Sequence, residues 1–225
     1  MKKAFILIAI ITLSLNMSSW AQKGKKNKLE NKVDSLSYAI GLSLGKSIKD
    51  QHIPDLNTDK IALAIEDILN TNEQKLSLEQ SQQIIKTYLT DLQEKQKQDN
   101  LIKANEFLED NRAKANVVVL PSGLQYEILR EGKGLSPTRT NKVRTHYKGT
   151  LLDGTTFDNS YDRGEPISFG VGQVIKGWQE ALQLMKPGSK WKLFIHPDLG
   201  YGERATNSIP ANSLLIFEIE LLNIE

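Results

Sequence analysis

The sequence contains no cysteine. Disulfide bonds, thiol catalysis, thiolate metal sites and a lipid anchor on cysteine are therefore all excluded. The protein must be held together by packing and hydrogen bonds alone. Hydrophobic residues make up 39% and charged residues 25% of the 225 residues, which is typical of a globular protein with a core of ordinary size.

An excess of charge of one sign is also missing. The formal net charge is +2, from 29 basic and 27 acidic residues. Lys2 and Lys3 lie in a segment that we expect to be removed, and without them 27 basic residues face 27 acidic ones. A neutral chain indicates no nucleic-acid partner and no partner attracted by long-range electrostatics.

Motifs for metals, phosphates and hydrolysis are scarce. There is no glycine-rich phosphate loop of either common spacing. The histidines stand far apart, at His52, His146 and His196, and none has a second histidine at metal-ligand spacing. A triad of His196, Asp198 and a serine is disfavoured, because nothing activates one serine over another. We expect no cofactor and no metal, and a surface position for His146.

The apolar run at residues 4–15 is too short to span a membrane, which takes about 20 residues. Lys2 and Lys3 precede it, and Ser19-Trp20-Ala21 follows it with small residues at the positions that a signal peptidase reads. We therefore expect a signal peptide at residues 1–21, with a membrane anchor as the alternative. The mature protein would have no membrane span and would be periplasmic, outer-membrane-associated or secreted.

Helical patterning dominates the first half of the mature chain. Residues 33–48 carry apolar side chains at helical spacing, and residues 57–70 predict a second, shorter helix capped by Asn57 or Thr58. A third helix is expected to begin at Ser77, and neither glycine nor proline follows before Pro121. It would run for about 40 residues, or roughly 60 Å. Its polar middle, residues 93–100, indicates a solvated stalk; the alternative is two helices joined there by a loop.

The pattern changes to strands near residue 116. Val143, Thr145 and Tyr147 alternate with polar residues, which is typical of a sheet with one wet face. Similar alternation recurs at residues 190–195 and 215–221, around one short amphipathic helix at 176–185. The sequence predicts an α+β fold, an antiparallel sheet with one helix. The expected divisions are a signal peptide at 1–21, a helical domain at 22–76, a linking helix at 77–116 and a sheet domain at 117–225.

Aromatic residues are spread over many segments of this second half, and several stand beside polar or turn residues. Asp158 and Arg163 flank Phe157, and Gly200-Tyr201-Gly202 places a tyrosine on a loop. An ordinary core is the simpler explanation for any one of them. Together they favour a concave apolar pocket with a few polar groups, the usual form of a site for a small ligand or a peptide.

Six stretches give this pattern a family resemblance. They lie at residues 143–149, 153–158, 174–178, 200–202, 209–210 and 215–221. In this order and spacing they resemble the FKBP family of peptidyl-prolyl cis/trans isomerases. Residues 120–126 are similar to the lead-in strand of the exported bacterial members of the Mip/FkpA type. Those members carry an N-terminal helical dimerisation unit joined by a long helix, so the resemblance implies a homodimer through the N-terminal helices.

The resemblance implies a twisted antiparallel sheet wrapped around the short helix, and it implies a site. The implied catalytic residues are Tyr147, Asp158 and Tyr201. The implied substrate-binding residues are Phe157, Arg163, Phe169, Val174, Ile175, Trp178, Ile209 and Phe217, with Trp178 as the pocket floor. Ile167 stands where many members have an aromatic residue, and Ser208 where an aliphatic one is common. These departures bear on binding of macrolide inhibitors and on the residue preferred before proline.

The implied function is acceleration of Xaa-Pro isomerisation during the folding of exported proteins, together with a chaperone role. The substrates would be unfolded or proline-containing polypeptides. The alternative is a non-catalytic dimeric chaperone or binding module that only holds unfolded chains. In either case, binding of a client at one site of the dimer would raise its effective concentration at the second site.

Overall fold

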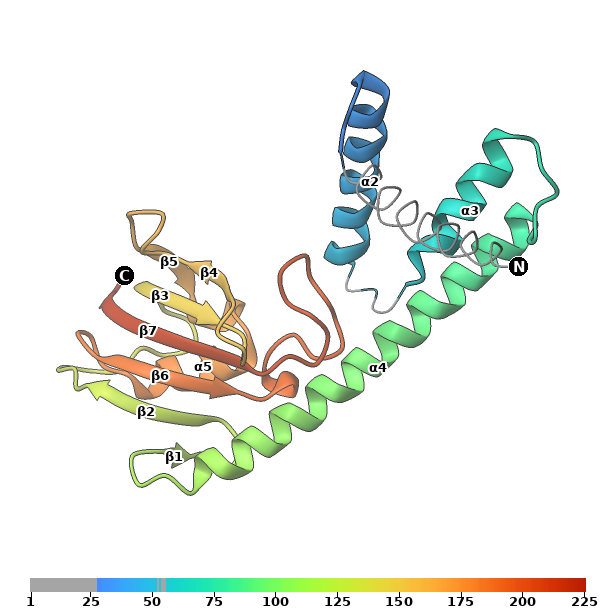
Figure 1. The fold of residues 1–225 in the computed structure, drawn as a ribbon. Coiled ribbons are helices and arrows are strands. Elements are labelled where there is room, and N and C mark those ends of the chain that lie inside the picture. Colours follow the sequence, from blue (N-terminus) through green and yellow to red (C-terminus); the bar gives the residue numbers. More distant parts are fainter. Residues whose placement is uncertain (1–27, 52, 54–55) are drawn as a thin grey trace, which may run out of the picture. The chain divides into compact units, whose positions relative to one another are not determined.

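The computed structural model describes residues 28–51, 53 and 56–225. The chain forms two compact units, the first ending at Lys75 and the second running from Leu76 to Glu225, and each is described by itself (Figure 1). The expected signal peptide, His52 and Pro54 lie outside the described residues. Within the described ranges, no helix is long and apolar enough to cross a membrane.

The first unit contains α2 (Lys32–Asp50) and α3 (Thr58–Leu69). Asn31 caps α2, because its side-chain oxygen accepts hydrogen bonds from the backbone N–H groups of residues 33 and 34 at 2.8 and 2.9 Å. Asn57 caps α3 in the same way, at 3.1 and 3.2 Å. Both predicted helices are confirmed. Of the two candidate N-caps for α3, Asn57 is the one observed.

Large apolar side chains on both helices are exposed in the part of the first unit that the structure describes. No residue of α2 is buried, and Val33, Leu36 and Ile40, which share one helical face, are 69%, 62% and 59% exposed. In α3, Ile68 is 49% and Leu69 is 76% exposed. Helices of this length gain most of their stability from packing an apolar face. Among the described residues of this unit, these apolar faces are therefore available for packing.

The second unit begins with the long helix α4 (Leu78–Arg112), which is continuous for 35 residues. Ser77 caps it with a reciprocal pair of bonds: the Ser77 hydroxyl accepts from the Gln80 N–H at 3.1 Å, and the Gln80 side chain accepts from the Ser77 N–H at 2.8 Å. The expected start is confirmed, and the alternative of a loop at residues 93–100 is wrong.

A seven-stranded sheet follows, in the order β1-β2-β6-β7-β3-β4, with β5 paired to β3, and every pairing is antiparallel. The strands are β1 (Val118–Val119), β2 (Gln125–Arg130), β3 (Lys142–Thr150), β4 (Thr156–Asn159), β5 (Ile167–Gly170), β6 (Lys190–Ile195) and β7 (Leu215–Ile224). The short helix α5 (Lys176–Leu184) lies between β5 and β6 in the chain. The α+β class and the antiparallel sheet with its one helix are confirmed.

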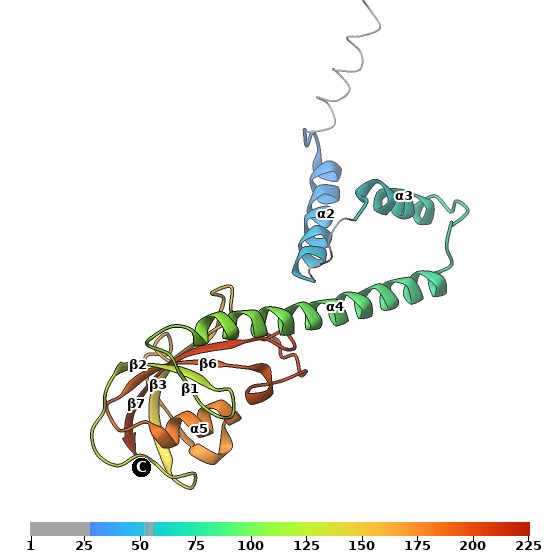
Figure 2. The same cartoon turned by 90° about the horizontal axis from the view of Figure 1, so that it is seen from below.

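The sheet lies between two helices, with α5 on one face and α4 on the other (Figure 2). On the α5 face, alternate residues of β6 and β7 are buried with Leu182 and Met185 in the main core. On the opposite face, Phe194 of β6 is only 3% exposed, because Ala104 and Leu108 of α4 cover it. The strand alternation predicted that Phe194 lies on the solvent-exposed face of the sheet. In the structure α4 covers that face at Phe194.

The last turns of α4, from Ala104 to Asn111, pack against the sheet, whereas most residues of the expected stalk at 93–100 are exposed. Asn111 is fully buried, and its amide donates to Gln125 Oε1 at 2.9 Å. Gln125 Nε2 in turn donates to the carbonyl of Leu108 at 2.8 Å. This chain of buried polar bonds joins the end of α4 to β2, and each member depends on its neighbour for a partner.

We predict that Asn111→Leu lowers the free energy of unfolding by about 1–3 kcal/mol, because it leaves the buried Gln125 oxygen without its donor. Equilibrium denaturation in urea measures the change, with the exposed neighbour Asp110→Asn as control. Adding Gln125→Leu should recover part of the loss, because two apolar partners leave no orphaned group. A double variant whose loss equals the sum of the two single losses would show that the pair is not coupled.

Candidate active site

Aromatic rings from four strands converge on Trp178, in the first turn of α5. Trp178 is 5% exposed and makes edge-to-face contacts with Tyr147 of β3 and Phe217 of β7, each at a centroid distance of 5.0 Å. Phe169 of β5 lies at 5.3 Å from Trp178, and Phe157 of β4 lies at 5.3 Å from Phe217. Such edge-to-face pairs are the favoured arrangement of aromatic rings. Trp178 thus lies at the centre of these ring contacts.

Several residues around Trp178 are only partly buried, so part of the cluster's apolar surface is accessible to solvent. Trp178, Phe217 and Ile209 are buried. The partly buried residues packed against them include Tyr147, Phe157, Phe169, Val174 and Ile175. An apolar surface of this kind beside a few polar groups suits a peptide or small-molecule ligand.

The backbone at the start of α5 holds Trp178 in place. The carbonyl of Ile175 accepts hydrogen bonds from the N–H groups of Trp178 and Gln179, each at 3.0 Å. The side chain of Gln179 donates back to the carbonyl of Val174 at 2.7 Å. These bonds fix the turn that carries Val174, Ile175 and Trp178 into the cluster.

Gly149 of β3 is a site residue that sequence reasoning did not single out. A Cβ atom at this position would lie 2.6 Å from the Phe157 ring and 2.8 Å from the Phe217 ring, closer than real side chains approach. Only glycine therefore allows these two rings to meet over β3. The available signal was a glycine inside a strand, which often marks a close approach.

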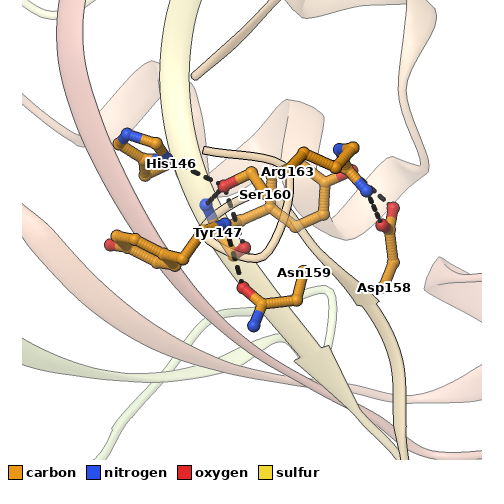
Figure 3. A network of polar contacts seen from close by, with 7 residues as sticks. His146, Tyr147, Asp158, Asn159, Ser160 and Arg163 are labelled. Carbon is orange, nitrogen blue, oxygen red and sulfur yellow. Dashed lines mark hydrogen bonds and ion pairs between the residues drawn. The ribbon is translucent and has the colours of Figure 1, made fainter. Parts of the chain in front are cut away.

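A polar network joins Tyr147 of the cluster to Asp158 of β4 and to Arg163 (Figure 3). The Tyr147 hydroxyl donates to Asp158 Oδ2 at 2.5 Å, and Arg163 Nη1 donates to Asp158 Oδ1. Arg163 Nη2 also donates to the Tyr147 hydroxyl at 3.1 Å, and the guanidinium lies 5.7 Å from the centroid of the Tyr147 ring. Three bonds among three side chains close a ring, which fixes how Tyr147 faces the cluster.

The pKa values within this network determine its charge state. Burial alone would raise the pKa of Asp158, but hydrogen bonds from Arg163 and Tyr147 outweigh it and hold that pKa below its ordinary value. Burial, reinforced by the bond to Asp158, raises the pKa of Tyr147 to about 12. At neutral pH the carboxylate is therefore ionised and the tyrosine keeps its proton.

The neighbouring His146 is half-buried, where a surface position was expected. Its Nδ1 lies 3.0 Å from the hydroxyl of Ser160, which accepts from the Tyr147 N–H at 2.8 Å, and its ring stacks on Tyr161 at 4.5 Å. Figure 3 shows His146 and Ser160 beside Tyr147. His146 of β3 thus stabilises the position of the turn that follows β4.

Tyr201 is the one predicted catalytic residue that the structure does not bring into the cluster. It lies in the loop at residues 200–212 and is 42% exposed. Ile209, on the same loop, does pack against the core with Trp178. Ile167 is half-buried on β5, and Ser208 is exposed on the loop.

Residues 41–45 read Gly-Leu-Ser-Leu-Gly, which is the spacing of a hydrolase nucleophile turn. They lie inside α2, and the Ser43 hydroxyl donates to the carbonyl of Ala39 one turn earlier. The nucleophile turn requires a sharp junction between a strand and a helix. This match therefore carries no chemistry.

Comparison with known proteins gives the class to which this fold and site belong. Residues 134–222 match the FKBP-type peptidyl-prolyl cis-trans isomerase family, and residues 33–128 match the domain amino terminal to that isomerase. The chain belongs to the FKBP-type peptidyl-prolyl cis-trans isomerase family, and it is an enzyme of that class acting on proline-containing substrates.

Among its relatives, the chain is similar over its whole length to proteins of the Mip and FkpA type. It is 39% identical to the outer membrane protein MIP of Legionella longbeachae, over 100% of this chain and 99% of that protein. It is 37% identical to the isomerase FkpA of Aeromonas hydrophila, over 99% of this chain and 94% of that one. The crystal structure of FkpA from Escherichia coli superposes with a TM-score of 0.71 at 36% identity, covering 88% of this chain and 99% of that chain.

The charge state of Asp158 predicts how stability depends on pH. Because its pKa is lowered in the folded protein, its stabilising effect is present above the ordinary carboxyl pKa of about 3.9 and is lost as pH falls through the folded value. Asp158→Asn should therefore be less stable than wild type at pH 7, by on the order of 1 kcal/mol for a partly exposed pair. Unfolding in urea at several pH values measures the difference.

The difference between wild type and Asp158→Asn should shrink toward zero as the pH drops below about 4. Asp162→Asn, an exposed change in the same turn, should show no such trend. A difference that stays constant from pH 7 to the acid limit would contradict the assignment of an ionised Asp158.

Proposed function

We propose that this chain speeds the isomerisation of Xaa-Pro bonds during the folding of exported proteins, and that the aromatic surface over Trp178 is its active site. The observation that carries the proposal is a buried tryptophan floor, 5% exposed, beneath a set of half-buried apolar side chains. A proline ring fits such a surface, and the remainder of the peptide would extend past the rim.

The reaction itself needs neither a nucleophile nor a metal. Rotation about the peptide bond is opposed by amide resonance, with a barrier of about 18–20 kcal/mol, and without help it takes tens to hundreds of seconds. The planar amide is more charge-separated than the twisted one, so water stabilises the ground state more. Surroundings made of Trp178, Phe157 and Phe217 remove that stabilisation and thereby favour the twisted state.

We assign the polar residues to orientation and electrostatics. Tyr147 and Asp158, held by Arg163, would fix the direction of the hydroxyl and the negative charge beside the substrate. The exposed Tyr201 would hold a carbonyl of the bound peptide. Each tenfold gain in rate asks for about 1.4 kcal/mol, which desolvation and a few hydrogen bonds can supply. Binding would be the role of Phe157, Phe169, Val174, Ile175, Trp178, Ile209 and Phe217.

We further propose a homodimer through the N-terminal helices, with residues 22–76 as the dimerisation domain, 77–116 as the linking helix and 117–225 as the isomerase domain. The exposed apolar faces of α2 and α3 support it, since a second copy would cover them. Export through a signal peptide at 1–21, a periplasmic or outer-membrane location and a chaperone role belong to the same proposal. Ile167 and Ser208 would alter the fit of macrolide inhibitors.

The alternative is a dimeric chaperone that holds clients without catalysis, and a refolding assay separates the two. Refolding of a client limited by a slow proline step should be faster with the wild-type chain, and Trp178→Ala should weaken the effect at least about tenfold. Tyr201→Phe should weaken it less. Trp191→Phe is the matched control, because Trp191 is equally buried but stacks on Tyr126 at 4.2 Å, outside the proposed site.

Near-ultraviolet circular dichroism checks that each variant keeps its fold. Suppose that the wild-type chain suppresses aggregation of the client but does not speed its slow proline-limited refolding phase. The chain would then act on this client as a chaperone without catalysis.

The dimer is tested by charge on the exposed face of α2. Leu36→Lys with Ile40→Lys should convert a dimer to a monomer in light scattering, because two buried charges per copy would face apolar side chains. Ser35→Lys, on another side of the helix, should leave the dimer intact. A wild-type chain that is already a monomer, or a double variant that stays dimeric, would refute this interface.

A further inference from the structure

The polar stretch of α4 contacts the loop at residues 200–212 near both of its ends. Lys97 Nζ forms an ion pair with Glu203 at 2.8 Å, and Asn100 Nδ2 donates to the carbonyl of Ala211 at 2.9 Å. Asn212 Nδ2 donates back to the carbonyl of Lys97 at 3.3 Å. Figures 1 and 2 both show this orange-red loop beside α4. One turn of the helix thus holds both the start and the end of the loop.

The segment that leads into the loop also contacts α4. His196 Nε2 lies 3.1 Å from Asn105 Oδ1, and the His196 Nδ1 accepts from the N–H of Asp198 at 3.2 Å. The turn η2 (Pro197–Leu199) follows directly and opens the loop. The path of the chain is therefore fixed to α4 before the loop begins.

Contacts inside the loop link these anchored ends to its middle. The Asn212 N–H donates to the carbonyl of Gly202 at 2.8 Å, which closes the loop at its base. Asn212 does so with φ at 54°, a left-handed conformation that asparagine tolerates better than most residues. The Thr206 N–H donates to the carbonyl of Ile209 at 2.8 Å, and the Ile209 N–H donates to the Thr206 hydroxyl at 3.0 Å.

The loop reaches the proposed active site through Ile209. Ile209 is 5% exposed and packs in the core cluster that contains Trp178, while Tyr201 stands at the other end of the loop. Residues 203–208 between them are exposed. A loop with so few buried side chains has little packing of its own to keep it ordered, so its bonds to α4 matter for where it lies.

We propose that Lys97, Asn100 and Asn212 are positioning residues for the isomerase site, through which α4 holds the loop that carries Tyr201 and Ile209 in the orientation that receives the peptide. This inference rests on the proposed function of the surface over Trp178. Without these bonds, the loop would have to be ordered each time a substrate binds. That ordering weakens binding of the ground state and the transition state alike, so KM rises while kcat changes little.

The test uses the mature chain with Lys97→Met and Asn100→Leu, which remove both anchors of the helix and keep good helix formers of similar size. The matched control is Lys95→Met with Gln96→Leu, on exposed positions of the same turn. Two measurements are made on each: hydrogen–deuterium exchange of the amides at 203–212, and kcat and KM for a proline tetrapeptide.

In the double variant, exchange in the loop should be faster and KM should rise roughly three- to tenfold, with kcat close to wild type. The control should match wild type in both measurements. Asn212→Gly keeps the left-handed backbone and loses only the side-chain bond, so it should shift KM in the same direction by less. Exchanging the charges, Lys97→Glu with Glu203→Lys, should leave KM near wild type, whereas Lys97→Glu alone should raise it.

Unchanged exchange in the loop would show that α4 does not hold it, and the proposal would be wrong. Faster exchange with unchanged KM and kcat would also refute it, because the position of the loop would then not matter to the site. Failure of the proposed function is a separate result. It would appear as a wild-type chain whose activity on the tetrapeptide is absent or insensitive to Trp178→Ala.

Discussion

Trp178 lies where β3, β5 and β7 meet the first turn of α5, and its edge-to-face contacts with Tyr147 and Phe217 decide the rest of the site. Each such contact contributes about 0.5–1.5 kcal/mol beyond the area that it buries. Part of the aromatic surface must also remain accessible, because a bound ligand has to contact it. Gly149 permits this packing, since it lets Phe157 and Phe217 meet over β3.

The same sheet is covered on its other face by α4, and this explains why the long helix is more than a spacer. Its last turns bury Ala104, Leu108 and Asn111 against the sheet, and its polar middle meets the loop at 200–212. The two halves of α4 therefore differ in what they contact within the compact unit. Near the sheet the helix supplies core, and farther along it supplies hydrogen-bond partners for a loop beside the site.

Periodicity and caps were sufficient to predict α2, α3 and the start of α4 at Ser77, because these depend on residues a few positions apart. Strand alternation likewise predicted β3, β6 and β7. Contacts between distant segments could not be predicted in this way. The polar stretch at 93–100 is indistinguishable from a solvated stalk until Asn100 meets Ala211, more than a hundred residues away. Phe194, an aromatic residue among the lysines of β6, was a signal that a second layer covers that face.

The central claim is that the Tyr147–Asp158–Arg163 network orients groups, while the apolar surroundings of Trp178 lower the barrier to rotation. Comparison of kcat/KM for a proline peptide in light and heavy water tests it most directly, because rotation breaks no bond to hydrogen. The account predicts the same value in both solvents. A clearly lower value in heavy water would mean that a proton moves in the rate-limiting step, and it would contradict the mechanism.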